Sequence, residues 1–187
     1  MDQPSYWVFK TKVTQNGKTI SGYSHITYVN QEKIRIDVFG PLGLIHAASV
    51  VYENQNFEAL LPLEKRFVFG EASEQTMEMV LKVPLDPAIF YNLIYQTGFE
   101  NKDWSCTLDE SNRVRECENR RAGLNVSWNS PMSRNGGEFE VKHAKGTARF
   151  TFNKYRELDQ VPNEKFKLNV PNGYKRFKVD SAGISKL

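Results

Sequence analysis

The stretch that decides the fold is KIRIDVFGPLGLIHAA, residues 33–48. In its first half Ile34, Ile36 and Val38 alternate with charged residues, which predicts a β-strand with one buried face. The run GPLG at 40–43 then turns the chain, because glycine adopts unusual backbone angles and proline fixes its own. A second strand is predicted from residue 44. Leu42 lies at the tip of this turn, where few neighbours can bury a leucine side chain.

The same texture of short strands and tight turns continues on both sides of this stretch. Asn16-Gly17 is a strong hairpin signal and predicts paired strands at 6–14 and 19–29. Alternation of Phe166, Leu168 and Val170 predicts another strand near the C-terminus. We count about ten or eleven strands along the chain. No linker, repeat or low-complexity segment interrupts it, so a single domain over residues 1–187 is expected.

The segment 73–98 departs from this pattern and predicts two helices. Met77, Val80 and Leu81 are spaced as on one helical face, which indicates a helix at 73–81. Asp86-Pro87 is typical of a helix start and Gly98 of a helix end, so a second helix is predicted at 87–97. The apolar residues of this second helix are Ile89, Phe90, Leu93 and Ile94.

These elements predict the fold class. A single antiparallel sheet of this length must curl, and if it does not close, its concave face needs a cover. We therefore expect a mainly β fold, a strongly curved, unclosed antiparallel β-barrel with a two-helix lid over the concave face. Such a sheet under a helical lid can enclose an apolar space, which is a common ligand site.

The two cysteines support this topology. Cys106 and Cys117 are equally far from Ser111-Asn112, so a hairpin turning there places them opposite each other, within disulfide range. We predict a Cys106–Cys117 disulfide and hence an oxidising compartment such as the periplasm. The alternative is two free thiols that are symmetric by chance.

Composition and motifs favour no catalytic or nucleic-acid function. The net charge of +3, from 25 basic and 22 acidic residues, is not that of a typical nucleic-acid-binding protein. No apolar run reaches the roughly 18 residues of a membrane span. His25, His46 and His143 have no partner at metal-ligand spacing, and His25 and His46 are expected to face solvent or to lie in a wall. No nucleophile elbow or phosphate-binding loop is present, so no enzyme activity, metal or cofactor is expected.

Two segments resemble a known family. RIDVFGPLG at 35–43 resembles the strand-and-loop signature of the bacterial outer-membrane lipoprotein receptor LolB. KVPLDPAIFYNLIYQTG at 82–98 resembles the helix pair of that family, and the order of elements agrees over residues 6–180. The resemblance implies a hydrophobic cavity that accepts acylated lipoproteins from the periplasmic carrier LolA and delivers them into the outer membrane. It also implies a membrane-transfer loop formed by Gly40, Pro41, Leu42 and Gly43, with Leu42 protruding. The alternative is a leucine folded back onto Val38 or Leu44.

The chain departs from the family pattern in three respects. Tyr28 stands where the family often has Trp, the cysteine pair is not a family feature, and the lipid-bearing N-terminal cysteine is not part of this sequence. The start MDQP lacks the features of a signal peptide, so either a cytosolic protein or one whose export segment was removed is expected. The resemblance favours the periplasmic face of the outer membrane, with a lipid anchor in the full-length form, or the soluble periplasm.

If acyl chains enter between lid and sheet, we expect both surfaces to supply apolar side chains. The predicted lining consists of Ile34, Ile36, Val38, Phe57, Ala59, Leu61, Phe90, Leu93 and Ile94. The expected partners of a monomeric protein are acylated lipoproteins, a LolA-like carrier and the outer-membrane lipid surface. Three alternatives remain open: a soluble LolA-like carrier, a periplasmic interaction protein with a filled interior, and a lipid hydrolase, for which no nucleophile constellation is found.

Basic residues near the C-terminus admit two interpretations. They either attract anionic lipid headgroups or form the solvated face of edge strands. These residues are Lys165, Lys167, Lys175, Arg176 and Lys178.

Overall fold

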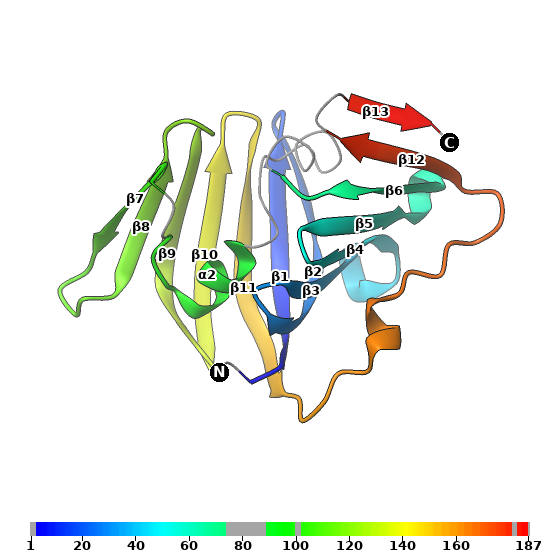
Figure 1. Ribbon diagram of the computed structural model, residues 1–187. Helices are drawn as coiled ribbons and strands as arrows, with labels where there is room; N and C mark the ends of the chain where they lie inside the picture. The colour runs from blue at the N-terminus through cyan, green and yellow to red at the C-terminus, as the bar shows by residue number, and fades with distance from the viewer. Residues whose placement is uncertain (1–2, 74–88, 100–101, 181–182, 187) are drawn as a thin grey trace.

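The computed structural model describes residues 3–73, 89–99, 102–180 and 183–186. These residues form one strongly curved sheet of thirteen strands in the order β13-β12-β6-β5-β4-β3-β2-β1-β11-β10-β9-β8-β7 (Figure 1). The strands are β1 (Ser5–Gln15), β2 (Lys18–Asn30), β3 (Lys33–Phe39), β4 (His46–Glu53), β5 (Asn56–Leu61), β6 (Arg66–Glu71), β7 (Trp104–Leu108), β8 (Val114–Asn119), β9 (Leu124–Ser133), β10 (Gly136–His143), β11 (Gly146–Glu157), β12 (Lys175–Asp180) and β13 (Gly183–Lys186). The sheet does not close, because β7 and β13 form its two edges. The mainly β, unclosed half-barrel is therefore confirmed, with more strands than the ten or eleven predicted.

The sheet is antiparallel except at one pair. β12 lies parallel to β6, with Lys175 opposite Arg66. The chain reaches this position through the long connection 158–174, which crosses the face of β3 opposite to the apolar core. Arg35 Nη1 donates to the Lys165 carbonyl at 2.5 Å, and Lys33 Nζ lies 4.7 Å from the ring centre of Phe166.

The prediction of a strand at 166–170 is wrong. That stretch follows the short 3-10 helix η4 (Asn163–Phe166) as irregular chain, and Phe166 alone is fully buried within it. The position beside β6 that a strand would need is occupied by β12, so the alternating side chains have no backbone partner to pair with.

The hydrophobic core lies on the concave face. Alternation along β2 and β3 buries Ile26 and Tyr28 on one strand and Ile34 and Ile36 on the next, and all four belong to one apolar cluster. Aromatic residues from the β1, β10 and β11 strands extend the cluster across the sheet. The period-two pattern seen in the sequence thus defines the inner surface.

The predicted helix at 73–81 lies, apart from residue 73, outside the described residues, as does the proposed start at Asp86-Pro87. The second predicted helix exists but is shorter, since α2 spans Phe90–Tyr95. It ends before Gly98 because Gln96 takes a left-handed conformation, φ 53°, and its backbone N–H donates to the Asn92 carbonyl. In the described parts of the chain α2 is the only α-helix, so the two-helix lid is not supported.

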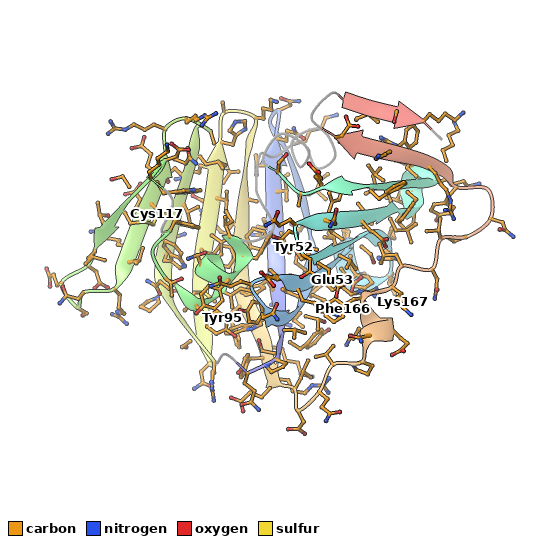
Figure 2. All side chains as sticks on the ribbon, viewed as in Figure 1. Tyr52, Glu53, Tyr95, Cys117, Phe166 and Lys167 are labelled. Carbon is orange, nitrogen blue, oxygen red and sulfur yellow. A yellow bond between two sulfur atoms is a disulfide. The ribbon has the colours of Figure 1, made fainter. Side chains whose placement is uncertain are left out.

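The disulfide prediction is confirmed. β7 and β8 pair with Cys106 directly opposite Cys117, and their sulfur atoms are bonded at 2.07 Å. Cys117 is fully buried in the apolar cluster and Cys106 packs against it. The bond therefore fastens the edge strand β7 to the core (Figure 2).

Candidate functional site

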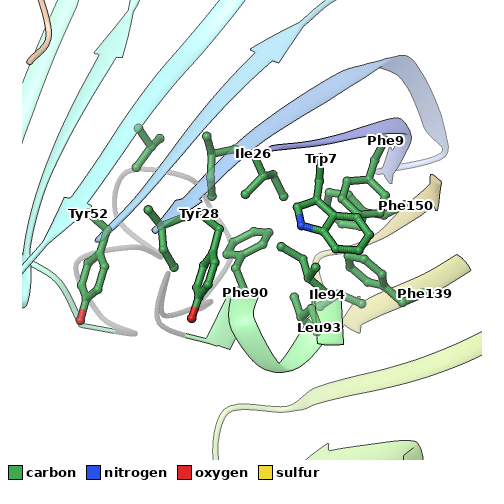
Figure 3. Packing of buried hydrophobic residues seen from close by; sticks show 14 of the residues in the cluster. Trp7, Phe9, Ile26, Tyr28, Tyr52, Phe90, Leu93, Ile94, Phe139 and Phe150 are labelled. Carbon is green, nitrogen blue, oxygen red and sulfur yellow. The ribbon is translucent and has the colours of Figure 1, made fainter. Parts of the chain in front are cut away.

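Helix α2 packs over the concave face of the sheet. Phe90, Leu93 and Ile94 are buried beneath it, in the cluster shown in Figure 3. The rings of Tyr91 and Tyr95 each lie 5.6 Å from the ring of Tyr28. The helix therefore covers β2 through aromatic contacts.

Hydrogen bonds to β8 and β9 hold the C-terminal end of α2 on the side of the helix away from β2. The Trp128 indole Nε1 donates to the Leu93 carbonyl at 3.0 Å. The Gln96 side chain donates to the Val114 carbonyl at 2.5 Å and accepts from the Met132 backbone N–H at 2.9 Å. These bonds attach the end of the helix to β8 and β9, so α2 is held in place over the concave face.

The residues predicted to line an acyl-chain cavity are brought together in one apolar cluster. Seven of the nine are buried, and Val38 and Leu61 are partly buried against them. The buried seven are Ile34, Ile36, Phe57, Ala59, Phe90, Leu93 and Ile94. Their role in holding an acyl chain stays a prediction.

Part of this interior is filled by aromatic rings. Phe139 stacks on Phe150 with ring centres 4.7 Å apart, and Phe9 meets Phe139 edge-on at 5.5 Å. Phe90 of α2 contacts Phe150 at 6.4 Å. A ligand chain in this half of the sheet would have to displace these rings.

A cavity of about 430 Å³ opens beside the C-terminal end of α2. Trp7 and Ile94 line it and also belong to the apolar cluster, so the cavity reaches the core. Arg134 lies at its exposed side, 2.5 Å from a Glu157 carboxylate oxygen and 5.4 Å from the ring centre of Tyr155. The lining consists of Gln3, Trp7, Ile94, Tyr95, Met132, Ser133, Arg134 and Tyr155.

Sequence reasoning included only Ile94 of this lining. Trp7 alternates with Phe9 and so belonged to a recognisable buried face. Met132 and Tyr155 come from β9 and β11, and their approach to β1 depends on the strand order, which no local pattern reveals.

The turn at 40–45 holds Leu42 away from the protein. Within it lies the 3-10 helix η1 (Pro41–Gly43), and the Gly40 N–H donates to the Ile45 carbonyl at 2.7 Å. The Gly43 N–H donates to the Gly40 carbonyl at 3.1 Å. Leu42 has φ 62° and is 83% exposed. Its side chain is thus not folded back on the sheet, while its role in membrane transfer stays a prediction.

A polar network lies under this turn, on the convex face. The Ser49 hydroxyl donates to the Asp37 carboxylate and lies 2.9 Å from His46 Nε2. Arg35 holds the same carboxylate with two hydrogen bonds, at 2.8 and 2.9 Å. His46 therefore has a hydrogen-bond partner three residues along β4, and the carboxylate of Asp37 on β3 lies 4.0 Å from its Nε2. Ser49 is 1% exposed, so this serine is not placed to attack a substrate.

His25 also has a partner on the convex face. The Tyr6 hydroxyl lies 2.8 Å from His25 Nδ1. Burial lowers the pKa of His25, and the Asp37 charge opposes this shift. Burial raises the pKa of Tyr6. Both shifts favour a neutral pair in the folded protein.

Neither a metal-binding cluster nor a membrane-spanning helix is found among the described residues. No group of three or more His, Cys, Asp or Glu side chains is arranged to hold a metal ion there. None of the helices in the described ranges is both long and apolar enough to span a bilayer.

Comparison with known proteins identifies the fold. No protein-family model matches the chain, and no curated protein matches it by sequence. Solved structures do match it. A DUF1329 family protein from Desulfovibrio piger superposes with a TM-score of 0.60 at 10% identity, covering 89% of this chain and 90% of that one. A LolA superfamily protein from Nitrosomonas europaea gives a TM-score of 0.56 at 8% identity, with coverage of 89% and 90%.

A third structure, described as an outer membrane lipoprotein-sorting protein domain from Vibrio parahaemolyticus, gives a TM-score of 0.52 at 9% identity, covering 88% of this chain and 89% of that one. The chain shares the fold of these proteins. At such low identity the likeness is one of fold, and the expected curved half-sheet of the LolA-like fold is confirmed without assigning the chain to LolB.

Proposed function

We propose that this protein binds the acyl chains of lipoproteins on its concave face and delivers them to the outer membrane, as a LolB-like receptor. The observation that carries the proposal is the cavity beside α2, whose Trp7 and Ile94 walls continue into the apolar cluster. The fold shared with a LolA superfamily protein and with a lipoprotein-sorting domain supports the same function.

The apolar part of the cavity wall, from Trp7, Ile94 and Met132, suits a hydrocarbon ligand. The cavity volume of about 430 Å³ is within the range of small-molecule sites, about 300–1,000 Å³. Each methylene removed from water contributes about 0.8 kcal/mol, so five buried methylenes give about 4 kcal/mol, or roughly a thousandfold in affinity. Ring faces and the Met132 thioether make no directional demands, which fits a cargo whose protein part varies.

A fluorescent fatty acid titration tests the binding step. We expect saturable binding by the unmodified protein and displacement by an unlabelled fatty acid. Met132→Trp places a larger side chain in the cavity and should weaken binding at least tenfold. Val170→Trp is the matched control, because Val170 lines a separate groove on the convex face. Thermal unfolding establishes that both variants are folded.

Two results of the fatty acid titration would contradict the proposal. Absence of saturable binding by the unmodified protein favours the alternative of an interaction protein, which the stacked Phe139 and Phe150 rings already support in one half of the interior. Equal weakening by Met132→Trp and Val170→Trp would remove the cavity from the explanation.

A soluble LolA-like carrier is the second candidate, favoured by the fold shared with a LolA superfamily protein. A transfer assay separates the two. A receptor releases a bound acylated lipoprotein into vesicles by itself, whereas a carrier retains it until a receptor is added. For the receptor we expect Leu42→Glu to stop release without loss of folding. A lipid-attachment cysteine in the precursor would support the same role.

Cargo would come from a LolA-like carrier, and the protein would act as a monomer in the periplasm or on the periplasmic face of the outer membrane. Delivery would use the turn of Gly40, Pro41, Leu42 and Gly43. A disulfide fits that compartment, because such bonds persist in oxidising surroundings.

A further inference from the structure

Exposed aliphatic side chains gather on two neighbouring turns. The turn between β3 and β4 exposes Leu42 (83%), Leu44 (81%) and Ile45 (50%). The turn between β5 and β6 contains the 3-10 helix η2 (Pro62–Glu64) and exposes Leu63 (71%). We call these four residues the aliphatic rim.

The strand register places both turns at the same end of the sheet. β3, β4, β5 and β6 are consecutive neighbours, and the antiparallel pairing brings the end of β3 and the end of β5 to one side. Ser49 of β4 lies opposite Leu60, so the start of β4 after Ile45 runs alongside η2. The aliphatic rim is therefore assembled at one end of the sheet from segments about twenty residues apart in the sequence.

Backbone hydrogen bonds hold the rim in a protruding conformation. The Gly40–Ile45 bond closes the first turn, and the Lys65 N–H donates to the Pro62 carbonyl at 3.2 Å in the second. Leu42 and Lys65 both have left-handed backbones, φ 62° and 50°. The hydrogen-bonded turn thus presents Leu42 in an exposed position.

The charge beside the rim is positive. Lys65 follows Leu63 by two residues, and the Lys175 N–H donates to the Lys65 carbonyl at 2.9 Å. Both lysines are exposed. The one carboxylate of the turn, Glu64, is paired with Arg66 at 2.8 Å. Among the described residues neither Lys65 nor Lys175 is in an ion pair, so their charges are available to an external anion.

We propose that the aliphatic rim, together with Lys65 and Lys175, docks on a bilayer surface that contains anionic headgroups. The four aliphatic side chains would enter the interface between headgroups and acyl chains, while the lysines contact the phosphates. Two narrow, protruding turns fit a deformable lipid surface. They lack the aromatic residues typical of protein–protein contact centres, so a protein partner is the less suitable occupant.

This inference rests on the proposed function for the presence of a membrane at the site of delivery. Docking goes beyond the proposed function because it adds a second turn, between β5 and β6, and a preference for anionic headgroups. Docking would be a two-point contact through Leu42 and Leu63, which limits the tilt of the half-barrel on the membrane to rotation about the line between these residues. A single inserted leucine would leave rotation about that point free.

Vesicle sedimentation tests the docking. The protein is mixed with vesicles of phosphatidylcholine alone, or of phosphatidylcholine with phosphatidylglycerol at three to one. We expect stronger binding to the anionic vesicles, weakened by salt, because one lysine near an anionic surface is worth about fivefold in affinity. Lys65→Gln with Lys175→Gln should lower binding to the anionic vesicles about 25-fold and leave binding to the neutral ones unchanged.

The apolar part is tested by Leu63→Gln, which should weaken binding to both kinds of vesicle about tenfold, since burial of a leucine contributes at least that factor. Leu108→Gln is the matched control, because Leu108 is 57% exposed at the end of β7 away from the rim. Unchanged binding by Leu63→Gln, or an equal loss in Leu108→Gln, would overturn the proposal. So would a protein that does not sediment with either vesicle, the result expected for a protein-binding rim.

The fatty acid titration keeps this test separate from that of the proposed function. A failure of docking alone leaves saturable fatty acid binding intact in every rim variant. A failure of the proposed function removes fatty acid binding from the unmodified protein while vesicle binding can still be measured.

Discussion

Replacing Leu42 by asparagine separates the stability of the exposed turn from its function. Leu42 has φ 62°, and a left-handed backbone costs a residue with a Cβ roughly 1–2 kcal/mol, a cost that asparagine bears more easily. The leucine side chain is 83% exposed, so its removal gives up only a small share of the roughly 1.5–3 kcal/mol that full burial would contribute. We therefore expect Leu42→Asn to raise stability by about 0.5–1 kcal/mol, the difference between these terms.

Thermal unfolding measures this gain. For a protein of this size 1 kcal/mol corresponds to about 2–4 °C in Tm, so an increase of about 1–4 °C is expected. Gln55→Asn is the control, because Gln55 is also exposed and left-handed, φ 64°, but lies in the turn between β4 and β5 at the far end of the strands. Both variants should gain stability.

Function should separate the two variants. Insertion of Leu42 into a bilayer would remove most of its side chain from water, so Leu42→Asn should weaken vesicle binding roughly tenfold or more and slow the release of an acylated lipoprotein. Gln55→Asn should behave as the unmodified protein. A loss of more than 1 kcal/mol of stability in Leu42→Asn, or unimpaired release, would refute the reasoning.

Three further changes test the fold. Gly70→Ala places a Cβ 1.9 Å from the Val179 carbonyl oxygen, so β12 must shift and urea unfolding should show a loss of about 1–3 kcal/mol. Replacing Cys106 and Cys117 by serine opens a link of 11 residues and should cost about 2–3 kcal/mol, seen as a lower urea midpoint without reductant. Burial lowers the pKa of His25, so the unfolded state binds the proton more tightly and stability falls as the pH drops below the unfolded pKa, about 6.5. His25→Gln should reduce the change in the urea midpoint between pH 7 and pH 5.

The local features of the fold were predictable from the sequence because they depend on neighbours in the chain. Alternation of Ile34, Ile36 and Val38 defines a strand whatever the strand pairs with. The hairpin register that joins Cys106 to Cys117 follows from the position of one turn. The exposure of Leu42 likewise follows from the glycines and the proline around it.

Features that depend on distant segments were not predictable. Phe166 and Leu168 alternate as a strand would, but the edge of β6 is taken by β12, which arrives in parallel after a long connection. Helix α2 ends at Tyr95, where Gln96 takes a left-handed conformation. The side chain of Gln96 bonds to residues of β8 and β9, contacts that its sequence neighbours do not reveal. The cavity shares this property, since its walls come from three strands (β1, β9 and β11) and from α2.

The cavity and the aliphatic rim lie at opposite ends of the strands, and this arrangement constrains the mechanism. Gln3 precedes β1 and Tyr155 is near the end of β11, whereas the rim is at the end where β1 turns into β2. A protein docked through Leu42 and Leu63 would therefore keep the cavity accessible to a carrier, and acyl chains would travel along the concave face to the bilayer.

Loading and docking should then be independent. Met132→Trp should weaken fatty acid binding at least tenfold and leave vesicle sedimentation unchanged, while Leu63→Gln should do the reverse. If Met132→Trp also weakened sedimentation, the cavity mouth would itself face the membrane. Cargo would then enter and leave by one opening, as a soluble carrier requires, and the receptor mechanism would lose its geometric basis.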